Sequence, residues 1–454
     1  MDDRYCKLIL FNNSDIIFLP NSFRIFSNQH SNDYQSDLKK LIDEEISLEE
    51  SYLNQNHIEK FITTTRFILN RCVLGISNAC NFACKYCYAG HGNYGSDERT
   101  MDFSVVKETI EKFYKAFTEI NTIQFFGGEP FLAFETITYA CNYISMLYKK
   151  NIIKKMPRFG ITTNGSILDD TKLKILKKYD IAITVSLDGW ADINNKLRKY
   201  KNGLETSNIV EQNIYRLKKE NIRVEIEATY TNIHIEENIG VFDILEYFYK
   251  KFGPISIHIP PVSAGVNENS SWRIFPKMTQ KCIENYREAI NKSFKTWIGD
   301  NQPISFSFLD RYLHALLKKN KMHLLCPAYL DTLAVWYNGD IYPCFMFWGN
   351  KFFRISNVFA IKPEELIYLN FDYLYTKLKY ESCRSCWARW LCSSCIGAIL
   401  MSQGNLNYPN QYLCEFNRAI IEEVILNLAK LRLDEFRWNT LIANLERLKK
   451  THKL

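Results

Sequence analysis

Short apolar runs alternate with helical patterns from Val73 to about Pro261, and this alternation limits the possible folds more than any other feature. Six runs have the length and residue types of strands: Val73–Ser77, Thr122–Phe126, Arg158–Thr163, Ala182–Leu187, Arg223–Tyr230 and Ile255–Ile259. The helical patterns between them are Ser104–Phe117, Phe134–Lys149, Asp170–Lys178, Thr206–Glu220 and Glu236–Lys251. Strands that alternate with helices form βαβ crossovers and a parallel sheet. The sequence therefore predicts an α/β fold with a partial (β/α)6 barrel, although the pattern alone does not separate a barrel from an open sheet.

The segments on either side of this region predict further modules, because 454 residues are too many for one ordinary core. Residues 1–70 contain three β-like runs and a helix-prone segment at Asp37–Ile62, which predicts a small α/β module. We expect the barrel with its bridging helices at 71–320, a cysteine-rich domain at 321–420 and C-terminal helices at 421–454. Within the cysteine-rich domain, Asn338–Gly339 predicts a hairpin with a type I′ turn.

Composition and charge exclude several classes of protein. The sequence has no stretch of about 18 apolar residues, so no membrane span is expected. The beginning of the chain is acidic and lacks a signal-peptide pattern, which predicts a cytoplasmic protein. The net charge of +7 comes from lysines that are scattered through helical stretches instead of forming a basic stripe, so no nucleic-acid partner is expected.

Fourteen cysteines are unusual for a cytoplasmic chain. A reducing compartment argues against a disulfide framework. Thiolates are soft ligands that suit iron and zinc, so the cysteines predict metal or cluster binding.

The strongest motif is Cys80-x3-Cys84-x2-Cys87, directly after the first predicted strand. Three thiolates on one tight loop can bind three irons of a four-iron cluster, which leaves the fourth iron without a protein ligand. Catalytic metal sites keep such an open position, whereas a structural zinc site normally uses four ligands. No histidine lies at a suitable offset to close a zinc site here.

This motif resembles the signature of the radical S-adenosylmethionine (SAM) superfamily, and the resemblance covers about Val73 to Pro261. It implies that the open iron binds SAM and that cleavage of SAM yields a 5′-deoxyadenosyl radical, which abstracts a hydrogen atom from the substrate. The segment Gly127-Gly128-Glu129-Pro130 resembles the GGEP motif of the family, which contacts the SAM ammonium. Glycine permits close backbone approach, and Glu129 supplies an acceptor for a cation.

Other residues that the resemblance places around SAM are Tyr88, Asn164, Ser186 and Arg198. Tyr88 would lie by the adenine, Ser186 would hydrogen-bond SAM and Arg198 would lie near its carboxylate. Three of these positions also have a plain structural reading: Tyr88 could be ordinary packing, Asn164 part of an Asn-Gly turn, and Arg198 a surface residue.

A second group of cysteines is Cys326, Cys344, Cys383, Cys386, Cys392, Cys395 and Cys414. Its paired CxxC units could also form zinc ribbons. The pattern resembles the SPASM domain, which follows the barrel in many peptide-modifying radical SAM enzymes and binds two auxiliary four-iron clusters. Three [4Fe-4S] clusters are thus implied in all. The spacing from Cys392 to Cys395 departs from the family, which commonly has three residues between these cysteines.

The same resemblance divides these seven cysteines between the two auxiliary clusters. It assigns Cys383, Cys386, Cys392 and Cys414 to the distal cluster, and the other three to the proximal one. Two full clusters need eight thiolates, so one iron lacks a ligand. Either another cysteine binds it, or it is open and binds a substrate thiolate.

The expected reaction follows from further comparison with peptide maturases. Sulfatase maturases place an aspartate after the cysteine that corresponds to Cys344, but this chain has Phe345, which argues against that class. Residues 87–94 and 228–231 resemble thioether-forming maturases of cysteine-rich clostridial peptides, and residues 1–70 suit a module that binds a leader peptide by strand addition.

We therefore expect a radical SAM maturase that forms thioethers between cysteine sulfur and carbon in a ribosomally made precursor peptide. A flavodoxin- or ferredoxin-type protein would supply electrons. Carbon–carbon cross-linking, epimerisation and anaerobic sulfatase maturation stay open, as does a binding or electron-transfer module without turnover. The sequence identifies no catalytic base.

Overall fold

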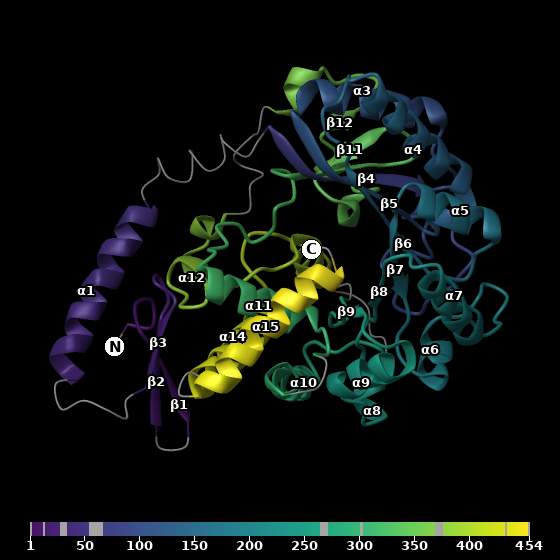
Figure 1. Ribbon diagram of the computed structural model, residues 1–454. Helices are drawn as coiled ribbons and strands as arrows, with labels where there is room; N and C mark the ends of the chain where they lie inside the picture. Colours follow the sequence, from purple (N-terminus) through teal and green to yellow (C-terminus); the bar gives the residue numbers. More distant parts are fainter. Residues whose placement is uncertain are drawn as a thin grey trace.

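The computed structural model describes residues 2–11, 14–27, 34–53, 67–263, 271–299, 303–367, 376–431 and 434–452 (Figure 1). Its centre is a run of six parallel strands in sequence order: β4 (Ile68–Ser77), β5 (Glu119–Gly127), β6 (Arg158–Thr163), β7 (Ala182–Ser186), β8 (Val224–Glu227) and β9 (Ser256–His258). The helices between them are α3 (Phe103–Ala116), α4 (Phe134–Lys149), α5 (Asp170–Lys178), α6 (Ala191–Leu197), α7 (Ser207–Lys219), α8 (Asn232–Glu236) and α9 (Val241–Phe252). The predicted α/β fold is confirmed, and β9 ends the sheet, so the barrel stays open.

The predicted helix Glu236–Lys251 begins five residues too early. Glu236 is the last residue of the separate short helix α8, and α9 begins only after Gly240. The backbone N–H of Gly240 donates to the Asp243 carboxylate at 2.8 Å, which caps the start of α9. The periodic pattern therefore hid a helix boundary.

The two faces of the six parallel strands differ in polarity. Outward residues such as Leu74, Phe125 and Val185 are fully buried against the helices that cover this face in Figure 1. The inward residues are mostly polar and only partly buried: Arg71, Gln124, Thr162, Thr184, Ser186, Glu225, Glu227 and His258. Parallel sheets covered on both faces are usually apolar throughout. The polar inner face therefore suits a ligand-binding lumen better than a packed core.

The sheet continues beyond β4 into the cysteine-rich region, which the sequence did not predict. β10 (Thr332–Val335) pairs in parallel with β4, and β11 (Asp340–Tyr342) and β12 (Ser356–Asn357) follow in antiparallel order. The predicted hairpin is present, but its turn is not type I′. Only Gly339 in this turn has a positive φ, of 88°, whereas type I′ requires positive φ at Asn338 as well.

The remaining helices are α10 (Thr279–Ile298), α11 (Ser307–Lys318), α12 (Glu381–Arg384), α13 (Ile396–Gln403), α14 (Gln411–Leu431) and α15 (Glu435–His452). Short 3-10 helices lie at Pro130–Ala133, Phe345–Phe347, Lys351–Phe353, Pro363–Leu366 and Lys377–Lys379. In the described part of the chain, none of the helices is long and apolar enough to span a membrane.

The N-terminal segment forms an antiparallel sheet of β1 (Lys7–Phe11), β2 (Ser14–Leu19) and β3 (Arg24–Ser27), followed by α1 (Tyr34–Leu53). The predicted helix 37–62 continues beyond Leu53 into residues that lie outside the described ranges. Figure 1 shows this sheet beside α14, which packs against all three strands. Asn21 joins it to the cysteine-rich region, since its Oδ1 accepts from Trp390 Nε1 at 2.7 Å and from Arg389 at 3.1 Å.

Candidate functional site

The loop that carries Cys80, Cys84 and Cys87 begins directly after β4 and is held by backbone hydrogen bonds. The Ala83 N–H donates to the Lys199 carbonyl at 2.8 Å, and the Lys85 N–H donates to the Leu197 carbonyl at 2.9 Å. These bonds fix the loop against the segment that contains Arg198. All three thiols are partly exposed.

The electrostatics of this loop show that its three thiols lie close together. Burial, followed by the negative charges of Glu129, Cys84 and Cys87, raises the pKa of Cys80 to about 12. Two donors face the sulfur atoms: Asn164 Nδ2 lies 3.8 Å from Cys80 Sγ, and an Arg198 guanidinium nitrogen lies 3.9 Å from Cys84 Sγ. Neighbouring donors stabilise thiolates, so this donor set fits a cluster held by three cysteines.

Three glycines let the cysteine loop approach the end of β5. A Cβ atom at Gly127 would lie 2.0 Å from the Ser77 carbonyl oxygen, and one at Gly128 would lie 2.4 Å from that of Ala79. At Gly92, a Cβ atom would lie 2.9 Å from the Cys80 Cβ. The sequence predicted that Gly127 and Gly128 admit a ligand. In the structure, the lack of a side chain at these two glycines makes room for the cysteine loop itself. Their contact with SAM stays a prediction.

Glu129 is fully buried, and both of its carboxylate oxygens accept hydrogen bonds. Oε1 accepts from the Phe131 N–H at 3.0 Å and from the Thr163 hydroxyl at 2.7 Å, and Oε2 accepts from the Asn164 N–H at 2.7 Å. Burial raises the pKa of Glu129, although these hydrogen bonds oppose the shift. The carboxylate therefore joins the ends of β5 and β6 and positions Asn164 beside Cys80.

Arg198 is buried, so the expectation that it could be a surface residue is wrong. Its Nε donates to Asp188 Oδ2 at 3.0 Å, and the Tyr86 hydroxyl donates to the same oxygen at 2.6 Å. Asp188 Oδ1 accepts from the Thr229 N–H at 2.9 Å, and His234 Nε2 lies 2.9 Å from the Asp188 carbonyl oxygen. Asp188 thus connects the cysteine loop with the ends of β7 and β8.

Sequence reasoning assigned no role to Tyr86, Asp188 or His234. A signal was present for Asp188, since an acidic residue follows the apolar end of a buried strand only two positions after Ser186. Ser186 itself is the last residue of β7, partly buried and opposite Glu227 of β8. Tyr88 is 39% exposed, and its hydroxyl lies 3.4 Å from that of Tyr94.

The four cysteines assigned to the distal cluster lie together. Cys383, Cys386, Cys392 and Cys414 line one cavity of about 200 Å³, and the cations Lys377, Arg389 and Arg418 line it with them. Burial, followed by the negative charges of the other three cysteines, raises the pKa of Cys383 to about 12. Four thiols around one cavity, with cations beside them, are a donor set that fits a four-iron cluster.

The three cysteines assigned to the proximal cluster also lie together. Burial, then Cys395 and Cys326, raises the pKa of Cys344 to about 12, whereas Arg71 lowers it. In the described ranges, no three His, Cys, Asp or Glu side chains are arranged to hold a metal ion. The ten cysteines nevertheless fall into groups of three, three and four, and the assignment of each group to a cluster stays a proposal.

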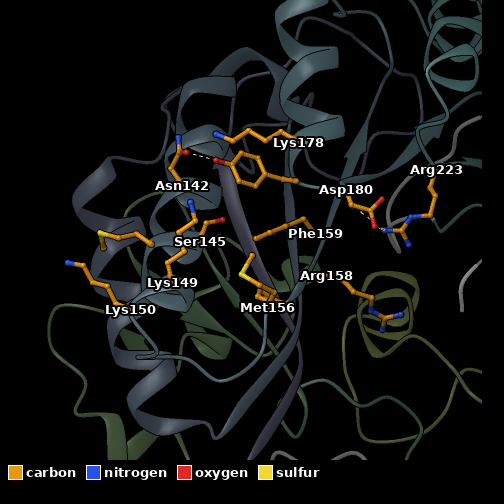
Figure 2. A pocket seen from close by; sticks show the side chains of 13 residues that line it. Asn142, Ser145, Lys149, Lys150, Met156, Arg158, Phe159, Lys178, Asp180 and Arg223 are labelled. Carbon is orange, nitrogen blue, oxygen red and sulfur yellow. Dashed lines mark hydrogen bonds and ion pairs between the residues drawn. The ribbon is translucent and has the colours of Figure 1, made fainter.

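A separate hollow of about 790 Å³ lies at the opposite end of the barrel strands (Figure 2). Lys149, Arg158 and Lys178 line it, and Figure 2 shows the ion pair of Arg223 with Asp180, whose N–O distance is 3.1 Å. None of the predicted site residues lines this hollow.

Comparisons with known proteins were made by family model and by sequence. Residues 74–247 match the model of the radical SAM superfamily. An uncharacterised protein of Methanocaldococcus jannaschii, MJ0907, is 30% identical over 60% of this chain and 83% of its own length. The cysteine-type anaerobic sulfatase-maturating enzyme of Clostridium novyi is 24% identical over 78% of this chain and 94% of its own. The radical SAM cyclopropyl synthase TigE of Paramaledivibacter caminithermalis is 23% identical, covering 85% of this chain and 82% of its own.

Two solved structures share the fold. The structure of anSMEcpe with bound AdoMet and a Cp18Cys peptide superposes with a TM-score of 0.66 at 21% identity, over 80% of this chain and 99% of that one. The structure of Streptococcus suis SuiB bound to its precursor peptide SuiA superposes with a TM-score of 0.53 at 15% identity, over 90% of this chain and 98% of that one.

Proposed function

Because this chain belongs to the radical SAM superfamily, we propose that it matures a ribosomally synthesised peptide by joining cysteine sulfur to carbon. The superfamily uses a four-iron cluster and SAM, and close homologues act on peptide or protein substrates. The observation that carries the proposal is the division of ten cysteines into groups of three, three and four. The group of Cys326, Cys344 and Cys395, which has three thiols, would offer an open position for a thiolate of the substrate.

The residues of the first site would divide their roles as follows. Cys80, Cys84 and Cys87 would hold the catalytic cluster, and Arg198 and Asn164 would stabilise its thiolates through the contacts described above. Tyr88, Gly127, Gly128, Glu129 and Ser186 complete the SAM site as the sequence predicted it. The bound cluster and SAM would supply the 5′-deoxyadenosyl radical that takes a hydrogen atom from the acceptor carbon.

The other two cysteine groups would hold the auxiliary clusters. Cys383, Cys386, Cys392 and Cys414 would bind the distal cluster fully, and Cys326, Cys344 and Cys395 would bind the proximal one with one position left for the substrate. The new S–C bond replaces one C–H and one S–H bond; the hydrogen atom goes to 5′-deoxyadenosine, the proton to solvent and the remaining electron to an iron–sulfur acceptor.

The partners follow from the same proposal. Residues 1–70 would bind the leader of the precursor peptide by adding a strand to the three-stranded sheet, whose outer strands β1 and β3 each have one neighbour within it. Residues 71–320, 321–420 and 421–454 would be the barrel, the auxiliary cluster domain and the C-terminal helices. A flavodoxin- or ferredoxin-type protein in the cytoplasm would supply electrons.

Sulfatase maturation is the second candidate, because the C. novyi enzyme aligns along nearly its whole length. The presence of Phe345 argues against sulfatase maturation. This side chain stacks on Phe126 at 4.2 Å between ring centres, so an apolar contact occupies the place where that class has an acidic residue. Carbon–carbon cross-linking and epimerisation of a peptide are two more reactions that suit the same scaffold.

Mass spectrometry of a co-expressed peptide tests the proposal. The peptide is the cysteine-rich product of a small reading frame beside the gene, and the enzyme is produced under anaerobic conditions. We expect a loss of two hydrogens for each cross-link, together with protection of the cysteines from alkylation, and no change with Cys84→Ala. An unmodified peptide, or a sulfatase-derived peptide oxidised in its place, would reject thioether formation.

A further inference from the structure

Arg71 lies on the inner face of β4, between the barrel lumen and the proximal cysteine group. Its backbone position is fixed, because the Arg71 N–H donates to the Asp331 carbonyl at 3.0 Å and the residue pairs with Thr332 of β10. One guanidinium nitrogen lies 3.4 Å from Gln124 Oε1 on the neighbouring strand. The side chain therefore extends along the inner wall of the barrel instead of into solvent.

The same guanidinium lies near the proximal cysteine group. Its carbon lies 5.9 Å from the centre of the Phe345 ring, and Phe345 follows Cys344 directly. Its charge also lowers the pKa of each thiol in the group, although burial has the larger and opposite effect. Arg71 is thus the cation shared by all three proximal cysteines.

The charge of Arg71 is not neutralised by an ion pair in the described part of the chain. Asp331, an acidic group whose pKa the charge of Arg71 lowers, instead accepts from Asn70 Nδ2 at 2.7 Å and from the Thr332 hydroxyl at 3.1 Å. A partly buried cation that lacks a paired carboxylate favours an anionic ligand. The stacked rings of Phe126 and Phe345, near the guanidinium, carry no charge that could neutralise it.

We propose that Arg71 is a positioning residue that holds the thiolate of the substrate cysteine at the proximal group. This inference rests on the proposed function and names the residue that makes an open position selective for a thiolate. A fourth thiolate would add negative charge beside three others, and a nearby guanidinium offsets that repulsion. The planar, permanently charged fork of arginine can also donate a hydrogen bond to sulfur while it keeps its contact with Gln124.

A small thiol tests this without knowledge of the natural peptide. The probe is N-acetyl-L-cysteine methylamide, added anaerobically to the reconstituted full-length enzyme, and the readout is the electron paramagnetic resonance spectrum of the reduced auxiliary clusters. Blocked serine and blocked aspartate of the same form are the comparison ligands. We expect the spectrum to change with the cysteine probe alone.

Three variants separate the role of Arg71 from general damage. Arg71→Met should need about tenfold more probe for half of the spectral change, the loss expected for one charge-assisted contact. Arg71→Lys keeps the charge and should stay within about threefold of the unmodified enzyme, a difference of roughly 0.7 kcal/mol. Arg216→Met removes an arginine from helix α7, where it pairs with Asp170, and should respond like the unmodified enzyme.

The outcomes are distinguishable. An Arg71→Met enzyme with full iron content and unchanged probe affinity would overturn the inference and leave the proposed function standing. Loss of one cluster's iron in both Arg71 variants would also overturn it, since Arg71 would then serve cluster assembly. Equal spectral changes with blocked aspartate would overturn the selectivity for a thiolate. An unmodified enzyme that ignores the cysteine probe would reject both the inference and the open position on which it rests.

Discussion

Replacement of Glu129 by glutamine tests whether this residue acts mainly as a clamp between β5 and β6. The carboxylate accepts from three donors, the Phe131 N–H, the Asn164 N–H and the Thr163 hydroxyl. Glutamine has the same size, but one of its two terminal atoms is a donor. Whichever way the amide turns, its NH₂ group faces a backbone N–H, either that of Asn164 or that of Phe131.

The size of the effect follows from these contacts. A buried donor left without an acceptor costs about 1–3 kcal/mol, and the loss of charge weakens the remaining hydrogen bonds by roughly another 1 kcal/mol. Removal of a buried charge offsets part of this free-energy cost, because burial disfavours the ionised form of Glu129. We therefore expect local destabilisation of about 2–3 kcal/mol, which corresponds to roughly 30- to 150-fold faster opening of the affected amides.

Hydrogen–deuterium exchange followed by mass spectrometry measures this opening directly. Exchange should accelerate in peptides that contain Phe131 and Asn164, while the outer strands of the N-terminal sheet exchange as before. Glu225→Gln is the matched control, since Glu225 lies on the same sheet and its carboxylate accepts no hydrogen bond from the described residues. Unchanged exchange in Glu129→Gln combined with selective loss of SAM binding would refute the clamp and make Glu129 a direct ligand.

Three further predictions concern other parts of the chain. Cys414→Ser should lower the iron content by about one cluster, whereas Cys141→Ser, a buried cysteine outside the groups, should leave it unchanged; iron analysis after anaerobic reconstitution checks both. Burial raises the pKa of Asp310 from 3.8 to about 7, so this carboxyl loses its proton at a lower pH in the unfolded chain than in the folded one. The free energy of unfolding should therefore fall as the pH rises from about 4 to 7, by at most about 4 kcal/mol. Asp310→Asn should remove this slope in thermal melts of the cluster-free protein. Glu49→Ala should leave the buried Arg389 guanidinium, now 2.6 Å from Glu49, without its carboxylate, cost about 3 kcal/mol and make the N-terminal sheet the first target of limited proteolysis.

Local patterns predicted most elements of the barrel because each strand and helix has a recognisable apolar pattern over a short stretch of sequence. β6, α4 and α5 have the predicted bounds, and β4 and β5 are only longer than expected. The failures have local causes too. A glycine and a side-chain cap start the last barrel helix at Val241, five residues later than predicted, and these features do not interrupt the apolar periodicity from which the helix was inferred.

Contacts between distant segments could not be predicted in the same way. The pairing of β10 with β4 joins residues more than 250 positions apart, and parallel pairing has no turn that would mark it in the sequence. The site shows the same limit. The spacing of Cys80, Cys84 and Cys87 was readable, but the buried contact of Asp188 with Arg198 and Tyr86 depends on three segments that only the fold brings together.

The register of β4 explains how one strand serves two cysteine groups. Its carboxyl end leads into the loop of Cys80, while Arg71, near its start, faces the proximal group from the inner wall. Both edges of the strand are bonded, to β5 and to β10, so hydrogen-bond ladders instead of flexible loops fix these two positions relative to one another. A slip of one residue would turn Arg71 into the apolar layer beneath the helices and bring Cys72, now buried there, to the lumen. Burying that cation beneath the helices would be energetically unfavourable, so the sheet keeps its register. The register in turn fixes the spacing of the two cysteine groups.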